Sequence, residues 1–173
     1  MSATWKNELG AAVAAAGRVV VLGVGNPDKG DDGAGPAVAA GLLARSAGQR
    51  GAGRPKPHLI IDGRETPESR TGEIRKFGPD LTIIVDATIG GHPAGTVFIV
   101  EKEEIADEGV STHTISLRYL VRYLEESIGS KVLVLGIEPS SLELGSLISI
   151  EVRHAVNEIV SELFDTFGNN TEI

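Results

Sequence analysis

Residues 19–36 read VVVLGVGNPDKGDDGAGP, an apolar run followed by a loop rich in glycine and aspartate. The run Val19–Val24 is rich in β-branched residues and shows no polar alternation, which is typical of a strand buried on both faces of a parallel sheet. Pro36 suits the first turn of a helix that continues through Leu43, because its fixed backbone angle is already helical. This stretch therefore predicts a strand, a loop and a helix, as in an α/β fold.

Four more apolar runs predict further strands. Three of them are short and uniformly apolar, and they span residues 59–61, 82–85 and 132–137. The fourth, residues 96–100, follows the strand that ends at Val85 after only a short turn, which favours an antiparallel pairing between these two strands. The predicted fold is a three-layer α/β/α sandwich with a twisted, mostly parallel five-stranded sheet and one antiparallel strand.

Two amphipathic segments predict helices that cover the sheet. Their apolar stripes run through residues 117–128 and 152–167, and both stripes are interpreted as core packing. Residues 1–17 form an Ala-rich N-terminal extension, predicted as either a short helix or a frayed end, and residues 168–173 are predicted to be a loose tail. Because no internal repeat or boundary is evident, residues 1–173 are expected to form a single α/β domain.

The composition argues against several classes of function. A formal net charge of −8 disfavours a nucleic-acid partner, since phosphates would be repelled. Lys56 lies in a stretch rich in glycine and proline that is interpreted as a solvated connection. The absence of cysteine removes disulfides, thiolate ligands and a cysteine nucleophile. With no signal-peptide pattern and no apolar span near the roughly 20 residues of a transmembrane helix, a soluble cytoplasmic protein without membrane insertion is expected.

The glycine-rich loop invites comparison with a dinucleotide-binding turn, but its spacing and its charge are wrong. Counting from Gly23 and Gly25, the third glycine position holds Asp28. Together with Asp31 and Asp32, this aspartate would face the negative charge of a pyrophosphate. A nucleotide-binding α/β protein is therefore a weaker alternative, and no cofactor-binding residue is assigned.

Ligands of such folds bind beyond the carboxyl ends of the strands, and several aspartates are expected there. Asp32 follows the first strand, where it either caps the next helix or faces the cleft; a cap needs only one of the adjacent residues Asp31 and Asp32. Asp62 and Asp86 each end a buried strand, where an aspartate either starts an Asx-turn or joins a site. Carboxylates gathered at one edge repel each other unless a proton or a cation lies between them.

Of the four histidines, His113 is the candidate metal ligand, whereas His58 has no obvious partner. His113 begins the amphipathic segment at residues 117–128, and a helix N-terminus disfavours the imidazolium and leaves a neutral ring that can bind a metal. A structural role for His113 is the alternative. Two carboxylates and an imidazole with open positions suit a borderline transition metal, so Asp32, Asp86 and His113 are predicted to converge on a metal ion.

Five motifs of this chain occur in the order seen in [NiFe]-hydrogenase maturation endopeptidases. They are Gly23-Val-Gly-Asn26, Gly30-Asp-Asp-Gly33, Ile84-Val-Asp-Ala87, Ser111-Thr-His113 and Leu135-Gly-Ile-Glu-Pro139. The chain resembles this family over roughly residues 18–167. The resemblance is closest to the branch that processes the large subunit of formate-hydrogenlyase-type hydrogenases.

The resemblance implies a hydrolase, an endopeptidase that removes a short C-terminal peptide from the [NiFe]-hydrogenase large-subunit precursor after nickel insertion. The nickel is delivered by the precursor and is not resident in the enzyme. By motif, Asp32, Asp86 and His113 correspond to the family's nickel-sensing ligands, so these three residues are assigned both the metal-binding and the catalytic role. The expected partner is the precursor, and the enzyme itself is expected to be a monomer.

One stretch departs from the family pattern. Where the family often has Asp-Gly-Gly-Thr, this chain reads Asp62-Gly-Arg-Glu-Thr66, so Arg64 and Glu65 stand beside the expected cleft. This change keeps open a second function, a non-proteolytic chaperone that binds nickel or the precursor. The N-terminal extension is a further difference and is expected to be peripheral.

Overall fold

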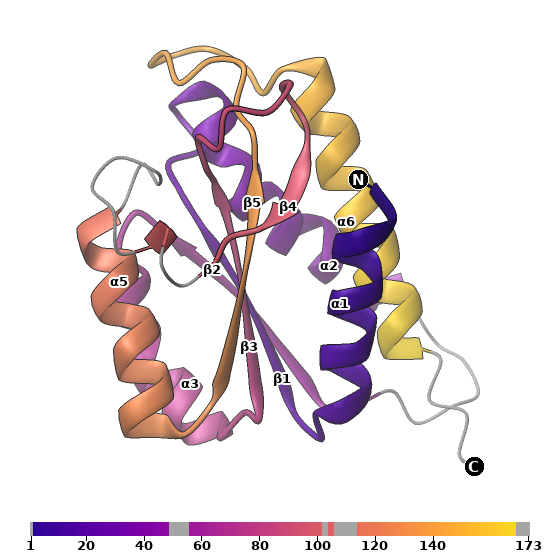
Figure 1. The fold of residues 1–173 in the computed structure, drawn as a ribbon, viewed down its shortest axis with the longest axis vertical. Coiled ribbons are helices and arrows are strands. Elements are labelled where there is room, and N and C mark those ends of the chain that lie inside the picture. The colour runs from indigo at the N-terminus through magenta and orange to yellow at the C-terminus, as the bar shows by residue number, and fades with distance from the viewer. Residues whose placement is uncertain (1, 49–55, 102–103, 106–113, 169–173) are drawn as a thin grey trace.

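The computed structural model describes residues 2–48, 56–101, 104–105 and 114–168, and these form three layers (Figure 1). Within them, the central sheet has five strands in the order β2-β1-β3-β5-β4. The strands are β1 (Val19–Val24), β2 (His58–Arg64), β3 (Leu81–Ala87), β4 (Val97–Ile99) and β5 (Lys131–Ile137). Four of them run parallel, and β4 runs antiparallel to β5. The predicted α/β sandwich with one antiparallel strand is therefore confirmed.

The neighbour of β4 differs from the prediction. The short connection after Val85 predicts that β4 pairs with β3, and this is wrong, because β4 pairs with β5. Residues 88–96 carry the chain past β5, which lies between β3 and β4 in the sheet. Two strand spacings amount to about 10 Å, a distance that a connection of this length crosses easily. A short connection therefore constrains the direction of the next strand without determining its partner.

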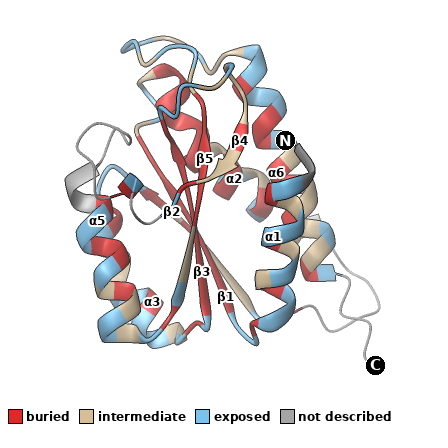
Figure 2. Cartoon of the chain, viewed as in Figure 1, coloured by how far each residue is buried: buried red, intermediate tan, exposed pale blue. Residues whose placement is uncertain are grey.

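Helices cover both faces of the sheet (Figure 1). One face carries α1 (Ser2–Ala15), α2 (Ala34–Gly48) and α6 (Ile150–Gly168), and the other carries α3 (Thr71–Phe77) and α5 (Thr114–Tyr123). Side chains of β1 alternate between the two layers: Val19 and Val21 pack in the core with α1, α2 and α6, whereas Val20 and Leu22 pack in the core with α3 and α5. Figure 2 shows the resulting buried sheet between two half-exposed helical layers.

The predicted helices are confirmed, with small shifts in their bounds. Pro36 lies in the first turn of α2, which begins directly after a 3₁₀ turn, η1 (Gly30–Gly33). A second 3₁₀ turn, η2 (Pro67–Arg70), leads into α3, and a π-helical turn, η3 (Leu124–Ile128), continues α5. Gly168 still belongs to α6, and the rest of the predicted tail lies outside the described residues. No helix in the described part of the chain has both the length and the apolarity needed to span a membrane.

The N-terminal segment is a helix, the first of its two predicted alternatives, and the expectation that it is peripheral is wrong. Trp5, Leu9 and Val13 of α1 are at most 3% exposed and belong to the core shared with α2 and α6. Lys56 Nζ donates to the carbonyl oxygens of Val13 at 2.5 Å and Ala16 at 2.6 Å. The prediction that Lys56 is solvated is therefore wrong: Lys56 is buried. Its positive charge is accommodated there because it binds carbonyl groups that the end of α1 leaves without helical partners.

Candidate functional site

Asp32 and Asp86 lie at the carboxyl edge of the sheet, on two elements that touch. Asp32 belongs to η1, which follows β1, and Asp86 is the next-to-last residue of β3. The turn η1 packs against β3. Both residues are buried, with exposures of 1% for Asp32 and 0% for Asp86. Buried carboxylates on adjoining elements suit a site that recognises a cation, since a cation offsets their mutual repulsion.

Two glycines allow η1 and the first turn of α2 to approach the strands closely. A Cβ atom on Gly25 would lie 1.8 Å from the backbone oxygen of Asp32, and the φ of Gly25, +131°, is one that other residues rarely adopt. A Cβ atom on Gly35 would lie 2.3 Å from the carbonyl oxygens of both Val24 and Val85. The glycines of this loop therefore serve close backbone packing at the strand ends.

The adjacent residues Asp31 and Asp32 make different contacts. Asp32 Oδ2 accepts a hydrogen bond from Asn26 N, within its own loop, at 2.9 Å. Asp31 is 1% exposed and accepts four hydrogen bonds from the chain after β5. The donors are Ser140 N at 2.7 Å, Ser141 N at 3.0 Å, Ser149 N at 2.7 Å and Ser149 Oγ at 3.0 Å. Asp31 thus fastens η1 in place, a role that the sequence could not reveal because its partners are at least 109 residues away.

Asp62 lies on the other face of the sheet from Asp86. Asp62 and Val85 are both register partners of Gly23, so their side chains lie on the same face of the sheet. Asp86 directly follows Val85, so its side chain projects from the opposite face. Asp62 Oδ2 accepts a hydrogen bond from Arg64 Nε at 3.3 Å, and its buried Oδ1 has no hydrogen-bond partner among the described residues. Arg64 has a φ of +48°, in the left-handed region that tight turns use. Its hydrogen bond to Asp62 supports this turn at the end of β2.

The two residues that depart from the family pattern at the end of β2 both contact the loop before η1, which carries Asp32. Gly25 N donates to the carbonyl oxygen of Arg64 at 2.9 Å. Asn26 Nδ2 donates to Glu65 Oε1 at 2.8 Å, while the backbone N–H of Asn26 donates to Asp32. The Arg64 contact is made by its backbone, whereas the Glu65 side chain reaches Asp32 through a single intervening residue, Asn26.

His113 lies outside the described residues, so its convergence with Asp32 and Asp86 stays a prediction. Asp86 shares a face of β3 with Ile84, which packs in the core beneath α3 and α5. The described chain resumes with the first residue of α5, Thr114. Within the ranges that the structure describes, no three His, Asp or Glu side chains form a group that could hold a metal ion.

Glu138 is a buried residue at the same edge; the sequence places it in the motif at residues 135–139 but assigns it no role. It is 6% exposed, and its Oε2 accepts hydrogen bonds from Gly90 N at 2.8 Å and His92 N at 3.1 Å. Its carbonyl oxygen also accepts from Gly95 N at 2.8 Å. Glu138 therefore fixes the connection between β3 and β4. The available signal was a charged residue placed directly after the apolar run at residues 132–137.

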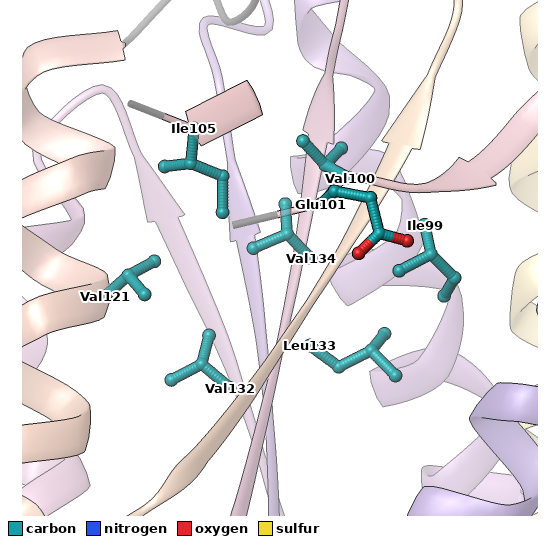
Figure 3. A pocket seen from close by; sticks show the side chains of 8 residues that line it. All are labelled: Ile99, Val100, Glu101, Ile105, Val121, Val132, Leu133 and Val134. Atoms are coloured by element: carbon teal, nitrogen blue, oxygen red, sulfur yellow. The ribbon is translucent and has the colours of Figure 1, made fainter. Parts of the chain in front are cut away.

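Two hollows lie elsewhere and include neither Asp32 nor Asp86. The pocket in Figure 3 encloses about 170 Å³ and is lined by Glu101, by apolar side chains of β4, β5 and α5, and by Val100 and Ile105, which follow β4 in the chain. A second, more open hollow of about 460 Å³ lies between α5 and the segment of η2 and α3. Its described lining comprises Glu68, Thr71, Tyr119, Leu120 and Tyr123.

Comparison with known proteins gives consistent matches. The family model HycI, described as hydrogenase maturation protease, matches residues 46–166. The Hydrogenase 3 maturation protease of Escherichia coli K12 is 35% identical over 151 residues, which cover 87% of this chain and 91% of that protein. The crystal structure of a [NiFe] hydrogenase maturation protease HycI from Thermococcus kodakarensis has a TM-score of 0.81 at 30% identity, covering 94% of this chain and 99% of that one. The solution structure of an endopeptidase HycI from Escherichia coli has a TM-score of 0.73 at 32% identity, covering 89% and 94%.

Proposed function

The chain belongs to the hydrogenase maturation protease family, and we propose that it removes a C-terminal peptide from a [NiFe]-hydrogenase large-subunit precursor once nickel has been inserted. The family makes the chain a peptidase that processes a hydrogenase precursor. The observation that supports the nickel-dependent part is the pair of buried carboxylates, Asp32 and Asp86, on adjoining elements at the carboxyl edge.

In this proposal nickel is part of the substrate and arrives bound to the precursor. Oxygen atoms of Asp32 and Asp86 and the imidazole of His113 complete its coordination, a ligand set that suits nickel. Without the cation, the precursor offers no positive charge for the two buried carboxylates to bind. The enzyme therefore acts on loaded precursor and leaves empty precursor intact.

The chemistry proposed is hydrolysis of one peptide bond. Nickel held against the scissile carbonyl oxygen withdraws electrons from the carbonyl carbon, which a water molecule attacks. A carboxylate of the site accepts a proton from this water, and a proton passes to the departing amine as the C–N bond breaks. The products are a shortened precursor with a new C-terminal carboxylate and a free peptide. The hydrogen bonds around η1 and after β2 hold Asp32 in place beforehand, which lowers the cost of reaching this arrangement.

Intact mass spectrometry of nickel-loaded precursor, taken from the same source and incubated with this chain, tests the proposed activity. We expect the precursor to lose the mass of one C-terminal peptide and the free peptide to appear as the second product. Binding of the precursor with no change in its mass would contradict proteolysis and favour the chaperone alternative. A melting temperature that rises in the presence of NAD or ATP would instead favour the nucleotide-binding alternative.

A further inference from the structure

The loop between β5 and α6, residues 139–149, places large apolar side chains in solvent; it is called the apical loop below. Leu144 is 74% exposed and Leu147 is 85% exposed, and Ile150, the first residue of α6, is 57% exposed. The loop crosses the top of the molecule at the carboxyl edge of the sheet (Figure 1). Single exposed apolar residues are ordinary, but three within seven positions are typical of a surface that binds another protein.

The apical loop is held to the body of the protein by specific hydrogen bonds. Asp31 accepts hydrogen bonds from both ends of the loop, through Ser140, Ser141 and Ser149. In the middle, Gly145 N donates to the carbonyl oxygen of Asp28 at 2.7 Å. A loop that is already ordered loses little conformational entropy when a partner covers it. The exposed leucines are therefore presented on a prearranged support.

The same hydrogen bonds connect the apical loop to the proposed active site. Asp31, which anchors the loop, directly precedes Asp32 in η1. A molecule seated on Leu144 and Leu147 therefore lies next to the edge where the scissile bond must arrive. A second copy of this chain in that position would crowd the approach of the substrate to Asp32. The partner that fits both the apolar surface and its location is the substrate itself.

We infer that the apical loop docks the folded body of the large-subunit precursor, with Leu144, Leu147 and Ile150 packing against an apolar patch of that protein. This inference rests on the proposed function and deepens it by identifying where the precursor binds. The loop supplies affinity and orientation, whereas Asp32 and Asp86 act at the bond that is cleaved. Loss of the leucines should therefore weaken binding without slowing the chemical step.

The test is a double variant, Leu144→Ser with Leu147→Ser, compared with Leu43→Ser on α2, where the leucine is 49% exposed. We expect the double variant to raise KM for nickel-loaded precursor roughly 10- to 100-fold, with kcat at saturating precursor close to that of the wild type. The control variant should leave both constants unchanged. Equal melting temperatures of the three proteins would show that the substitutions leave the fold intact.

Three outcomes would overturn the inference, and they differ from one another. If the wild type cleaves the precursor and the double variant does so with the same KM, the loop is not the docking surface and the proposed function stands. If the double variant loses kcat at unchanged KM, the loop acts in the chemical step. If sedimentation shows a wild-type dimer that the double variant abolishes, with KM unchanged, the leucines bind a second copy. Failure of the wild type to cleave any precursor would remove the proposed function itself.

Discussion

Asp86→Ala is expected to lower the rate of tail removal from nickel-loaded precursor by at least about a thousand-fold. Asp86 is fully buried near the end of β3, so the substitution removes a carboxylate from the site and leaves the exposed surface of the enzyme unchanged. The rate is read as the fraction of precursor that has lost its C-terminal peptide, by intact mass spectrometry over a time course. The melting temperature of the variant is measured in parallel to confirm that it is folded.

The matched control for Asp86 is Asp28→Ala. Asp28 lies in the loop between β1 and η1 and is exposed, so its carboxylate can be removed without disturbing the buried pair. We expect processing by Asp28→Ala to remain within a few-fold of the wild type, because exposed charges contribute little. Full activity in a folded Asp86→Ala variant would exclude Asp86 from the site.

Substitution of Asp32 is expected to lower activity, whereas substitution of the neighbouring Asp31 is expected to lower stability. Asp32→Asn should lower processing about 100-fold or more with little change in the melting temperature, since the amide keeps an oxygen for Asn26 N but loses the negative charge that attracts a cation. Asp31→Asn should lower the free energy of unfolding by about 2–4 kcal/mol, because an amide NH₂ then faces N–H donors of the apical loop. For a domain of this size that loss corresponds to a melting temperature lower by roughly 5–15 °C.

Thermal unfolding and processing assays on both variants, each well below its melting temperature, measure this contrast. The outcome that would contradict the division of roles is a stable, inactive Asp31→Asn together with an unstable but active Asp32→Asn. That result would move the site one residue along η1.

The strands and most of the helices of this fold could be predicted because each leaves a local signal, whereas the short helix α3 was not predicted. The apolar run at residues 19–24 indicates a strand buried on both faces, and the stripe at residues 152–167 indicates a helix with one buried face. The partner of β4 could not be predicted, since it depends on the position of β5, a strand that follows it in the sequence. Local patterns thus predict whether a segment is a strand or a helix better than they predict which elements lie beside it.

The candidate site was predicted only in part for the same reason. The location of Asp32 and Asp86 at the carboxyl edge of the sheet, where ligands of parallel sheets bind, could be predicted, and both residues are buried there. The role of Asp31 depends on backbone donors that follow it by 109 to 118 residues. Lys56 looked solvated in its glycine- and proline-rich setting, although its partners are carbonyl groups at and just after the end of α1, 40 and 43 residues before it. Contacts of such long range have no periodic signature in the sequence.

The central claim is that this enzyme distinguishes a nickel-loaded precursor from an empty one through Asp32 and Asp86. The most direct test incubates the wild type with the same precursor prepared with and without nickel, and follows both by intact mass spectrometry. We predict loss of the C-terminal peptide from the loaded form and an unchanged mass for the nickel-free form. Cleavage of the two forms at equal rates would contradict nickel recognition, while leaving the chain a protease.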